Sequence, residues 1–108
     1  MRVGILGSTT LNIESEDVYK LAARFVYPNE IDSVVTTNDD GIAATAREIA
    51  QNKGLGLRVF DYYKRVVEDC AFVVIVRTSE EFPTYARYCG QKGRPFREYV
   101  VSKPKRQE

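Results

Sequence analysis

The sequence of 108 residues contains no histidine. This absence excludes Ser-His-Asp and Cys-His activation of a nucleophile, and it excludes the usual zinc sites. Any catalysis would have to use carboxylates, lysine, tyrosine, serine or threonine, or a group of the substrate itself. We therefore expect no metal ion, and we also expect no cofactor.

Cysteine is scarce as well, with Cys70 and Cys89 as the two examples. Both stand among apolar or aromatic neighbours, and their separation matches neither a metal-ligand spacing nor a C-x-x-C redox pair. We predict two buried thiols in a reducing compartment, which favours a cytoplasmic protein. A reactive cysteine is the alternative.

Long apolar runs and an excess of charge of either sign are also missing. The formal net charge is +1, which is too small for a general attraction to nucleic acid or to an anionic membrane. No run approaches the length that spans a bilayer, and no signal segment opens the chain, so we expect no membrane association. With 44% hydrophobic and 29% charged residues, the composition predicts one folded domain over residues 1–102 and a polar tail over 103–108.

Short apolar, β-branched runs alternate with helical patterns along the chain. Strands that are apolar on both faces and alternate with helices are typical of parallel sheets. The sequence therefore predicts an α/β fold, a Rossmann-like open, mostly parallel five-stranded sheet with helices on both faces. We expect strands at 2–6, 31–37, 57–63, 70–76 and 95–101, and helices at 15–27, 40–54 and 79–93 with one helical turn at 64–69.

Polar residues and prolines mark the expected helix ends. Ser15 is a candidate N-cap for the first helix, and Pro28 would end that helix. Asp39 or Asp40 would cap the second helix, and the last helix would begin near Ser79 or Pro83.

The carboxyl edge of the predicted sheet is the expected position of a ligand, because open α/β sheets bind ligands there, where the strand order reverses. Small, polar or acidic residues follow three strands at this edge, at 7–10, 36–41 and 77–81. Two of these stretches lead into helices, whose free N–H groups attract phosphate or carboxylate groups. Each stretch alone also fits an ordinary turn or helix cap. The predicted ligand-binding residues are Gly7, Ser8, Thr9, Thr37, Asn38, Asp39, Gly41, Thr78 and Ser79.

The adjacent acids Asp39 and Asp40 restrict the ligand that this edge would accept. They would repel a phosphate placed beside them, and they suit ribose hydroxyls or an adenine amino group better. Neither G-x-G-x-x-G nor G-x-x-x-x-G-K-[ST] is present, so neither the dinucleotide fingerprint nor the P-loop applies.

Four segments resemble, in this order, the SLOG superfamily: RVGILGS, SVVTTNDDGIAATAREIA, DCAFVVIV and SEEFPTYARYCGQKGRPFREYVV. This superfamily includes the lysine-decarboxylase-like LOG phosphoribohydrolases and the DNA-processing protein DprA, and the YspA-like, DUF2493-type domains are the most similar subgroup. Gly7-Ser8 matches the first motif of that subgroup and Gly41 the second, with Thr37-Asn38 in place of paired glycines. The P-G-G-x-G-T-x-x-E signature of the LOG enzymes is absent.

The resemblance implies a nucleotide, ADP-ribose-like or phosphoribosyl ligand. The first hypothesis is therefore a binding module, a sensor, carrier or regulator that holds a nucleotide-derived small molecule at the carboxyl edge. Gly7 would let the backbone approach the ligand, with Ser8 and Thr9 donating to phosphate or ribose. Asn38 and Asp39 would bond to the sugar or the base.

Two other functions stay open. A nucleotide N-glycosidase or phosphoribohydrolase-like hydrolase would use a carboxylate to stabilise oxocarbenium-like charge or to activate water, with Asp39, Asp40, Glu80 and Glu81 as candidates. An interaction or nucleic-acid role would use the segment YARYCGQKGRPFREY, where aromatic residues and cations are interleaved. Solvated cations on an amphipathic helix explain that segment more simply, so we do not expect nucleic acid as a partner. The seven tyrosines favour a homo-oligomer, a dimer or larger, since aromatic residues are enriched at interface cores.

Overall fold

The computed structural model describes residues 1–101, so the predicted tail over 103–108 lies outside the described part of the chain. Strands and helices alternate strictly along it. The strands are β1 (Arg2–Gly7), β2 (Ser33–Thr37), β3 (Gly56–Phe60), β4 (Phe72–Thr78) and β5 (Phe96–Val101). The helices are α1 (Ser15–Ala23), α2 (Ile42–Lys53), α3 (Tyr63–Asp69) and α4 (Thr84–Lys92), with a 3-10 turn at Pro28–Glu30. Within residues 1–101, none of the helices has the length and apolar composition that crossing a membrane requires.

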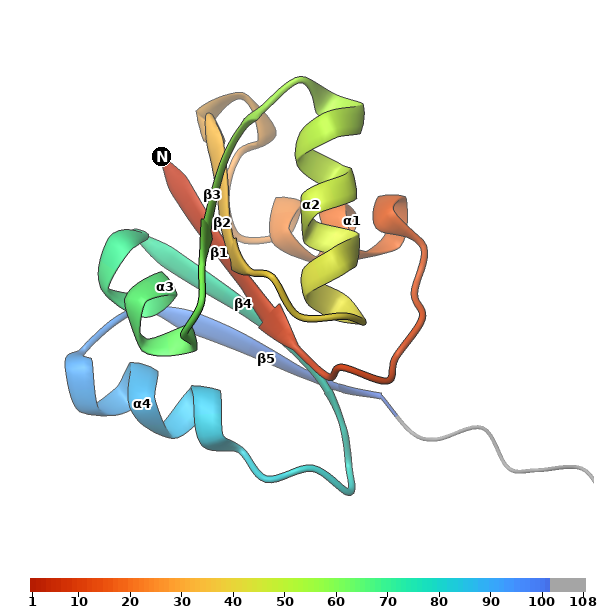
Figure 1. Cartoon of the computed structure of the whole chain (residues 1–108). Helices are drawn as coiled ribbons and strands as arrows, with labels where there is room; N and C mark the ends of the chain where they lie inside the picture. Colours follow the sequence, from red (N-terminus) through yellow and green to blue (C-terminus); the bar gives the residue numbers. More distant parts are fainter. Residues whose placement is uncertain (102–108) are drawn as a thin grey trace, which may run out of the picture.

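All five strands pair in parallel, in the order β3-β2-β1-β4-β5, which confirms the predicted open α/β sheet. The chain builds the sheet outward from β1 to β3, and α3 then leads back to β4 on the other side of β1 (Figure 1). The strand order therefore reverses between β1 and β4. At such a reversal the two following loops diverge to opposite faces of the sheet and leave a crevice between them.

Helices cover both faces of the sheet, with α1 and α2 on one face and α3 and α4 on the other (Figure 1). Neighbouring residues of a strand point to opposite faces, so each strand supplies two cores. Ile5 packs in the α1–α2 core, whereas Leu6 packs in the α3–α4 core. Val34 and Val35 divide in the same way. This division explains why the central strands β1 and β4 carry continuous apolar runs instead of alternating.

Alanines on the inner face of α2 let this helix lie close to the sheet. Ala43, Ala46 and Ala50 are buried there, together with Ile42 and Ile49. Each fully buried isoleucine contributes about 2 kcal/mol through the area that it removes from water. The close approach brings the amino end of α2 directly against the loop after β1.

The predicted first helix is longer than α1, which ends at Ala23 and not at Pro28. Beyond Ala23, the tertiary packing of Phe25 and Val26 prevails over the helical spacing of the apolar residues in the sequence. The Phe25 ring leaves the helix and stacks with Phe72 at a centroid distance of 6.3 Å, and Val26 turns into the core.

The predicted caps are wrong, because no side chain caps α1, α2 or α4 at its amino end. Glu14, and not Ser15, occupies the N-cap position of α1. Gly41 occupies that of α2, so neither Asp39 nor Asp40 caps it. Both acids are exposed and lie before the helix.

The last helix, α4, begins at Thr84 with Pro83 as its N-cap, so Ser79 lies in a turn before it. A residue that precedes proline is disfavoured in the helical conformation, which keeps Phe82 out of α4. The Phe82 side chain is 84% exposed.

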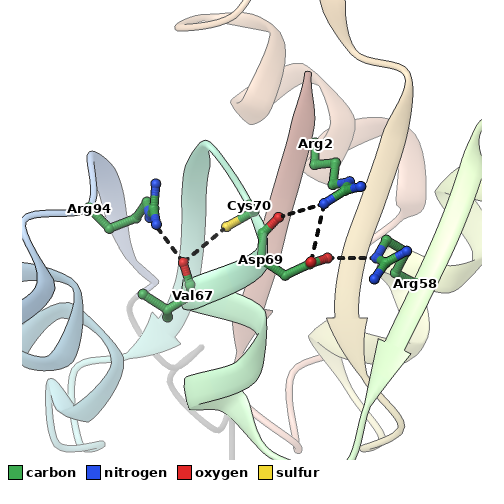
Figure 2. A network of polar contacts seen from close by, with 6 residues as sticks. All are labelled: Arg2, Arg58, Val67, Asp69, Cys70 and Arg94. Atoms are coloured by element: carbon green, nitrogen blue, oxygen red, sulfur yellow. Dashed lines mark hydrogen bonds and ion pairs between the residues drawn. The ribbon is translucent and has the colours of Figure 1, made fainter.

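Polar contacts fix the carboxyl end of α3 at the amino edge of the sheet (Figure 2). The Asp69 carboxylate accepts hydrogen bonds from Arg58 Nε at 2.6 Å and from Arg2 Nη1 at 3.2 Å. The Nε atom of Arg94 donates to the carbonyl oxygen of Val67 at 3.0 Å. These contacts join β1, β3 and the turn before β5 to the end of α3.

Cys70 and Cys89 are free thiols, and both are buried in the α3–α4 core, as predicted. Burial raises the pKa of each thiol to about 11. The thiolate is the nucleophilic form of cysteine. Both thiols are therefore protonated at neutral pH, which disfavours the reactive alternative.

Candidate functional site

The three predicted stretches all leave the sheet at its carboxyl edge, because all the strands are parallel. β1 and β4, the pair at which the order reverses, end side by side there. The N–H of Ser8, directly after β1, donates to the carbonyl oxygen of Val76 in β4 at 2.9 Å. Ser8 is 1% exposed, so its hydroxyl lies beneath the surface of the crevice.

The side chain of Glu81 reaches from the loop after β4 back to both strands. Its Oε1 atom accepts hydrogen bonds from the N–H and the hydroxyl of Thr78, at 2.8 and 2.9 Å. The Ser8 hydroxyl shares a hydrogen bond with the Thr10 hydroxyl at 3.1 Å, and it also acts on the Glu81 carboxylate to lower its pKa. Glu81 therefore lies where β4 ends beside β1, and the two donors of Thr78 fix its orientation.

These hydrogen bonds also set the charge of Glu81. Burial alone would raise the pKa of its carboxyl, but the bonds from Thr78 and Ser8 and the charge of Arg77 outweigh burial. The pKa consequently lies below the ordinary value of 4.5. Glu81 is an ionised carboxylate at neutral pH, able to accept hydrogen bonds but not to donate them.

Arg77, the penultimate residue of β4, holds the loop that carries Glu81. Its guanidinium contacts both carboxylate oxygens of Glu98 in β5, at 2.9 and 3.3 Å. Its Nη1 atom donates to the carbonyl oxygens of Thr78 and Glu81, at 3.0 Å each. The planar guanidinium fork suits this task because it binds several acceptors in one fixed geometry.

A hollow of about 400 Å³ lies beside Glu81 on the α3–α4 side of the edge. Its lining consists of Tyr63, Glu81, Phe82, Thr84 and Tyr85. Tyr63 begins α3 and Tyr85 lies in the first turn of α4, and their rings meet edge to face at 5.0 Å. The hollow thus combines a fixed carboxylate acceptor with aromatic walls.

Asp39 adds a second negative charge near this hollow. Burial raises the pKa of the Tyr85 hydroxyl, and the charges of Asp39 and Glu81 raise it further. The Thr37 hydroxyl donates to Oδ2 of Asp39 at 2.7 Å. Arg47 of α2 donates to the carbonyl oxygens of Thr37 and Asp39, at 2.7 and 2.9 Å. All three predicted stretches therefore contribute to the same region.

Several predicted ligand-binding residues lie away from the hollow. Thr9 and Gly41 line a different hollow of about 280 Å³, on the α2 side of the crevice. Asn38 turns toward β3, where its Nδ2 atom donates to the Asp61 carboxylate at 3.3 Å. Ser79 is exposed in the turn after β4.

The four candidate acids separate into two pairs. Glu81 lines the hollow, and the charges of both Asp39 and Glu81 raise the pKa of the Tyr85 hydroxyl. Asp40 and Glu80 are exposed and do not line the hollow. Of the four acids, Asp39 and Glu81 are therefore the candidates for a catalytic role.

Gly7 faces protein instead of an open crevice, and the first N–H of α2 already has a protein acceptor. A β-carbon added at Gly7 would lie 2.1 Å from the carbonyl oxygen of Val76, so this glycine admits the neighbouring strand. The N–H of Ile42, the first residue of α2, donates to the carbonyl oxygen of Ser8 at 2.9 Å. That donor is therefore not free for a phosphate.

Sequence reasoning missed the aromatic wall of the hollow. Tyr63 was expected at the end of a strand and Tyr85 beside the buried face of a helix. A usable signal was present, because aromatic residues follow the ends of two strands, as Tyr62-Tyr63 after β3 and as Tyr85 after β4. Parallel strands bring such positions to one edge.

The interleaved aromatic and cationic segment does not form one surface. Tyr85 and Tyr88 lie on the α3–α4 side of the sheet. Arg97 instead stacks on Phe25 at 4.6 Å, and Tyr99 packs against the α1–α2 core. A single strand of nucleic acid bound to one face of the sheet would therefore contact only some of these aromatic and cationic side chains.

Fold and hollow together define a Rossmann-like α/β domain with an acidic, aromatic-lined hollow beside the loop after β4, one of the two strands between which the order reverses. Across residues 1–101, no group of three or more histidine, cysteine, aspartate or glutamate side chains is placed to hold a metal ion. Comparison with protein-family models, with curated proteins and with solved structures gives no match. The resemblance to the SLOG superfamily therefore stays a prediction.

Proposed function

We propose that this protein binds a small molecule derived from a nucleotide, with the ribose and the base in the hollow beside Glu81. Its role would be that of a sensor, carrier or regulator. The observation behind the proposal is the Glu81 carboxylate, which Thr78 fixes at the end of β4 and on which the Ser8 hydroxyl, at the end of β1, also acts. Open α/β sheets bind their ligands at this point of strand-order reversal.

The chemistry of the lining supports a ligand that carries hydroxyl groups and an aromatic ring. A carboxylate accepts hydrogen bonds from the ribose hydroxyls or from an amino group of the base. A base can stack on the exposed ring of Phe82, and base–aromatic stacking contributes about 1–3 kcal/mol. Asp39 and Glu81 repel anions, so the phosphate of such a ligand would point away from them.

Hydrolysis of an N-glycosidic bond is the second candidate function. An ionised Glu81 beside a bound ribose would stabilise oxocarbenium-like charge in the transition state. A general acid, however, needs a raised pKa, and the pKa of Glu81 is lowered. We therefore favour binding without turnover. Release of free adenine from AMP during incubation with the protein would instead establish hydrolysis.

Calorimetric titration with adenosine tests the binding proposal. We expect adenosine to bind the wild-type chain, and to bind Glu81→Gln at least about tenfold more weakly, since the variant loses a charged acceptor. Glu68→Gln is the matched control, because Glu68 is an exposed acid near the other end of α3. Its affinity should equal that of the wild type.

Two results would contradict the proposal. The first is equal adenosine affinity in Glu81→Gln and the wild type. The second is the absence of binding by adenosine, AMP and ADP-ribose at millimolar concentration. Thermal unfolding of each variant, followed by circular dichroism, separates a lost contact from a lost fold.

A homo-oligomer, a dimer or larger, is a further part of the proposal. The side chains of Tyr27 and Tyr62 are 74% and 51% exposed, and aromatic residues are enriched at interface cores. Sedimentation velocity measures the assembly directly, and a monomer at every concentration would contradict it.

A further inference from the structure

We infer that the groove between α3 and α4 is a subsite for the phosphate group of the ligand. This inference rests on the proposed function, because it places the phosphate end of the ligand whose ribose and base are proposed to lie in the hollow. The groove has a volume of about 240 Å³. All its lining side chains carry a hydrogen-bond donor and none is a carboxylate: Tyr63, Lys64, Thr84, Arg87, Tyr88 and Gln91.

Positive charge gathers in this groove without a neutralising partner. Neither Lys64 nor Arg87 belongs to any of the ion pairs found in residues 1–101. The Nζ atom of Lys64 lies 5.0 Å from the ring centre of Tyr88, and the Nζ atom of Lys92 lies 5.7 Å from the same ring. A cation–π contact positions an ammonium group but does not cancel its charge. The groove is therefore ready to accept an anion.

The groove and the hollow beside Glu81 are adjacent, since Tyr63 and Thr84 line both. The Tyr63 ring contacts Tyr85 on the hollow side at 5.0 Å and Tyr88 on the groove side at 5.7 Å. The surface thus changes from negative to positive across one aromatic ring. A nucleotide has the matching polarity, with hydroxyl and amino donors at one end and an anionic phosphate at the other.

The turn after β1, where a phosphate was expected, is a poorer site. The carbonyl oxygen of Ser8 already accepts the N–H of Ile42, and Asp39 and Glu81 place negative charge nearby. The donors of the groove come from α3 and α4 instead, on the other side of the hollow. The inferred ligand therefore lies across the two helices, with its phosphate directed away from the crevice.

Adenosine and AMP form a suitable pair of probes, because they differ only in the phosphate. We expect AMP to bind the full chain about tenfold more tightly than adenosine, as one new charge-assisted contact would produce. The double variant Lys64→Gln/Arg87→Gln should lose this advantage while its adenosine affinity stays at the wild-type value. Lys20→Gln/Arg24→Gln removes the same charges from exposed positions on or just after α1 and should keep the advantage.

An AMP advantage that persists in Lys64→Gln/Arg87→Gln would overturn the inference, as would equal affinities for AMP and adenosine in the wild type. Pyrophosphate, followed by amide chemical shifts, gives a test that does not need a nucleoside. Shifts at Lys64, Arg87 and Tyr88 that vanish in the double variant would support the subsite even if adenosine does not bind, and the proposed function alone would then fail. If neither adenosine nor AMP binds and pyrophosphate leaves these amides unchanged, the subsite is refuted as well.

Discussion

Gly41 approaches Ser8 so closely that a β-carbon at position 41 would lie 2.2 Å from the Ser8 carbonyl oxygen. Gly41 also has a φ of 71°, which lies in the left-handed region that favours glycine. The same Ser8 carbonyl accepts the N–H of Ile42 at 2.9 Å. Two loops of the carboxyl edge are therefore held together through a position that only glycine can occupy.

Replacement of this glycine should destabilise the fold strongly. We expect Gly41→Ala to lower the free energy of unfolding by about 3 kcal/mol or more, because overpacking adds to the cost of the backbone conformation. Gly54→Ala is the control, since Gly54 has a φ of 65° but no atom within 4 Å of an added β-carbon. We expect Gly54→Ala to lower the free energy of unfolding by about 1 kcal/mol. Urea unfolding measures both, and equal losses would show that the contact with Ser8 does not matter.

A third glycine should respond in the opposite direction. Gly90 lies inside α4, and an added β-carbon there would meet nothing within 4 Å. Glycine in a helix interior costs about 0.5–1 kcal/mol relative to alanine. Gly90→Ala should therefore raise the free energy of unfolding by about this amount. A decrease in the thermal midpoint would contradict the exposed, unstrained position of this residue.

The lowered pKa of Glu81 predicts a dependence of stability on pH. The unfolded chain has the ordinary glutamate pKa of 4.5, and the folded chain has a lower one. The stabilisation from Glu81 is therefore complete above pH 4.5 and is lost as the pH falls through the folded pKa. Below pH 4.5, the stability of Glu81→Gln should decrease less steeply than that of the wild type.

Urea unfolding at a series of pH values compares the two proteins. The pKa of Asp32 is also lowered, chiefly by a hydrogen bond from the N-terminal amine, but this contribution is the same in both. Only the difference between the two curves is attributed to Glu81. Parallel curves across the acid range would refute its role as a fixed, ionised carboxylate.

The sheet could be predicted because the apolar pattern of its central strands is compatible with one arrangement, a parallel sheet between two layers of helices. A run such as Val73–Val76 is apolar on both faces, and such a strand needs helices above and below it. Parallel pairing then follows from the alternation with helices, and parallel strands carry their polar ends to one edge. For this reason Ser8 and Glu81 could be placed at a common edge from the sequence alone.

The directions of the loop side chains could not be predicted in this way. Beyond the last strand residue no periodicity applies, and each side chain follows the local path of its loop. Asn38 consequently turns toward Asp61, and Thr9 lies beside Gly41 on the α2 side. The predicted helix starts were wrong for the same reason. At the start of α2, two loops approach each other closely, and Gly41 occupies the N-cap position that was expected for Asp39 or Asp40.

A substitution at Asp69 allows an effect on the stability of the fold to be distinguished from an effect on ligand binding at the candidate site. Its carboxylate binds Arg2 and Arg58 at the amino edge of the sheet, opposite the hollow (Figure 2). The two arginine side chains are 48% and 47% exposed, so solvent weakens these ion pairs. We expect Asp69→Asn to lower the free energy of unfolding by about 1–2 kcal/mol, measured by urea unfolding.

Adenosine affinity should be unchanged in Asp69→Asn, because no lining residue of the hollow belongs to this network. The neighbouring Glu68→Gln should alter neither stability nor affinity, since Glu68 is exposed. Calorimetric titration below the unfolding temperature of each variant makes the comparison. If Asp69→Asn lowers the adenosine affinity as much as Glu81→Gln does, the lower affinity reflects the reduced stability of the domain. Glu81 then has no specific role in binding.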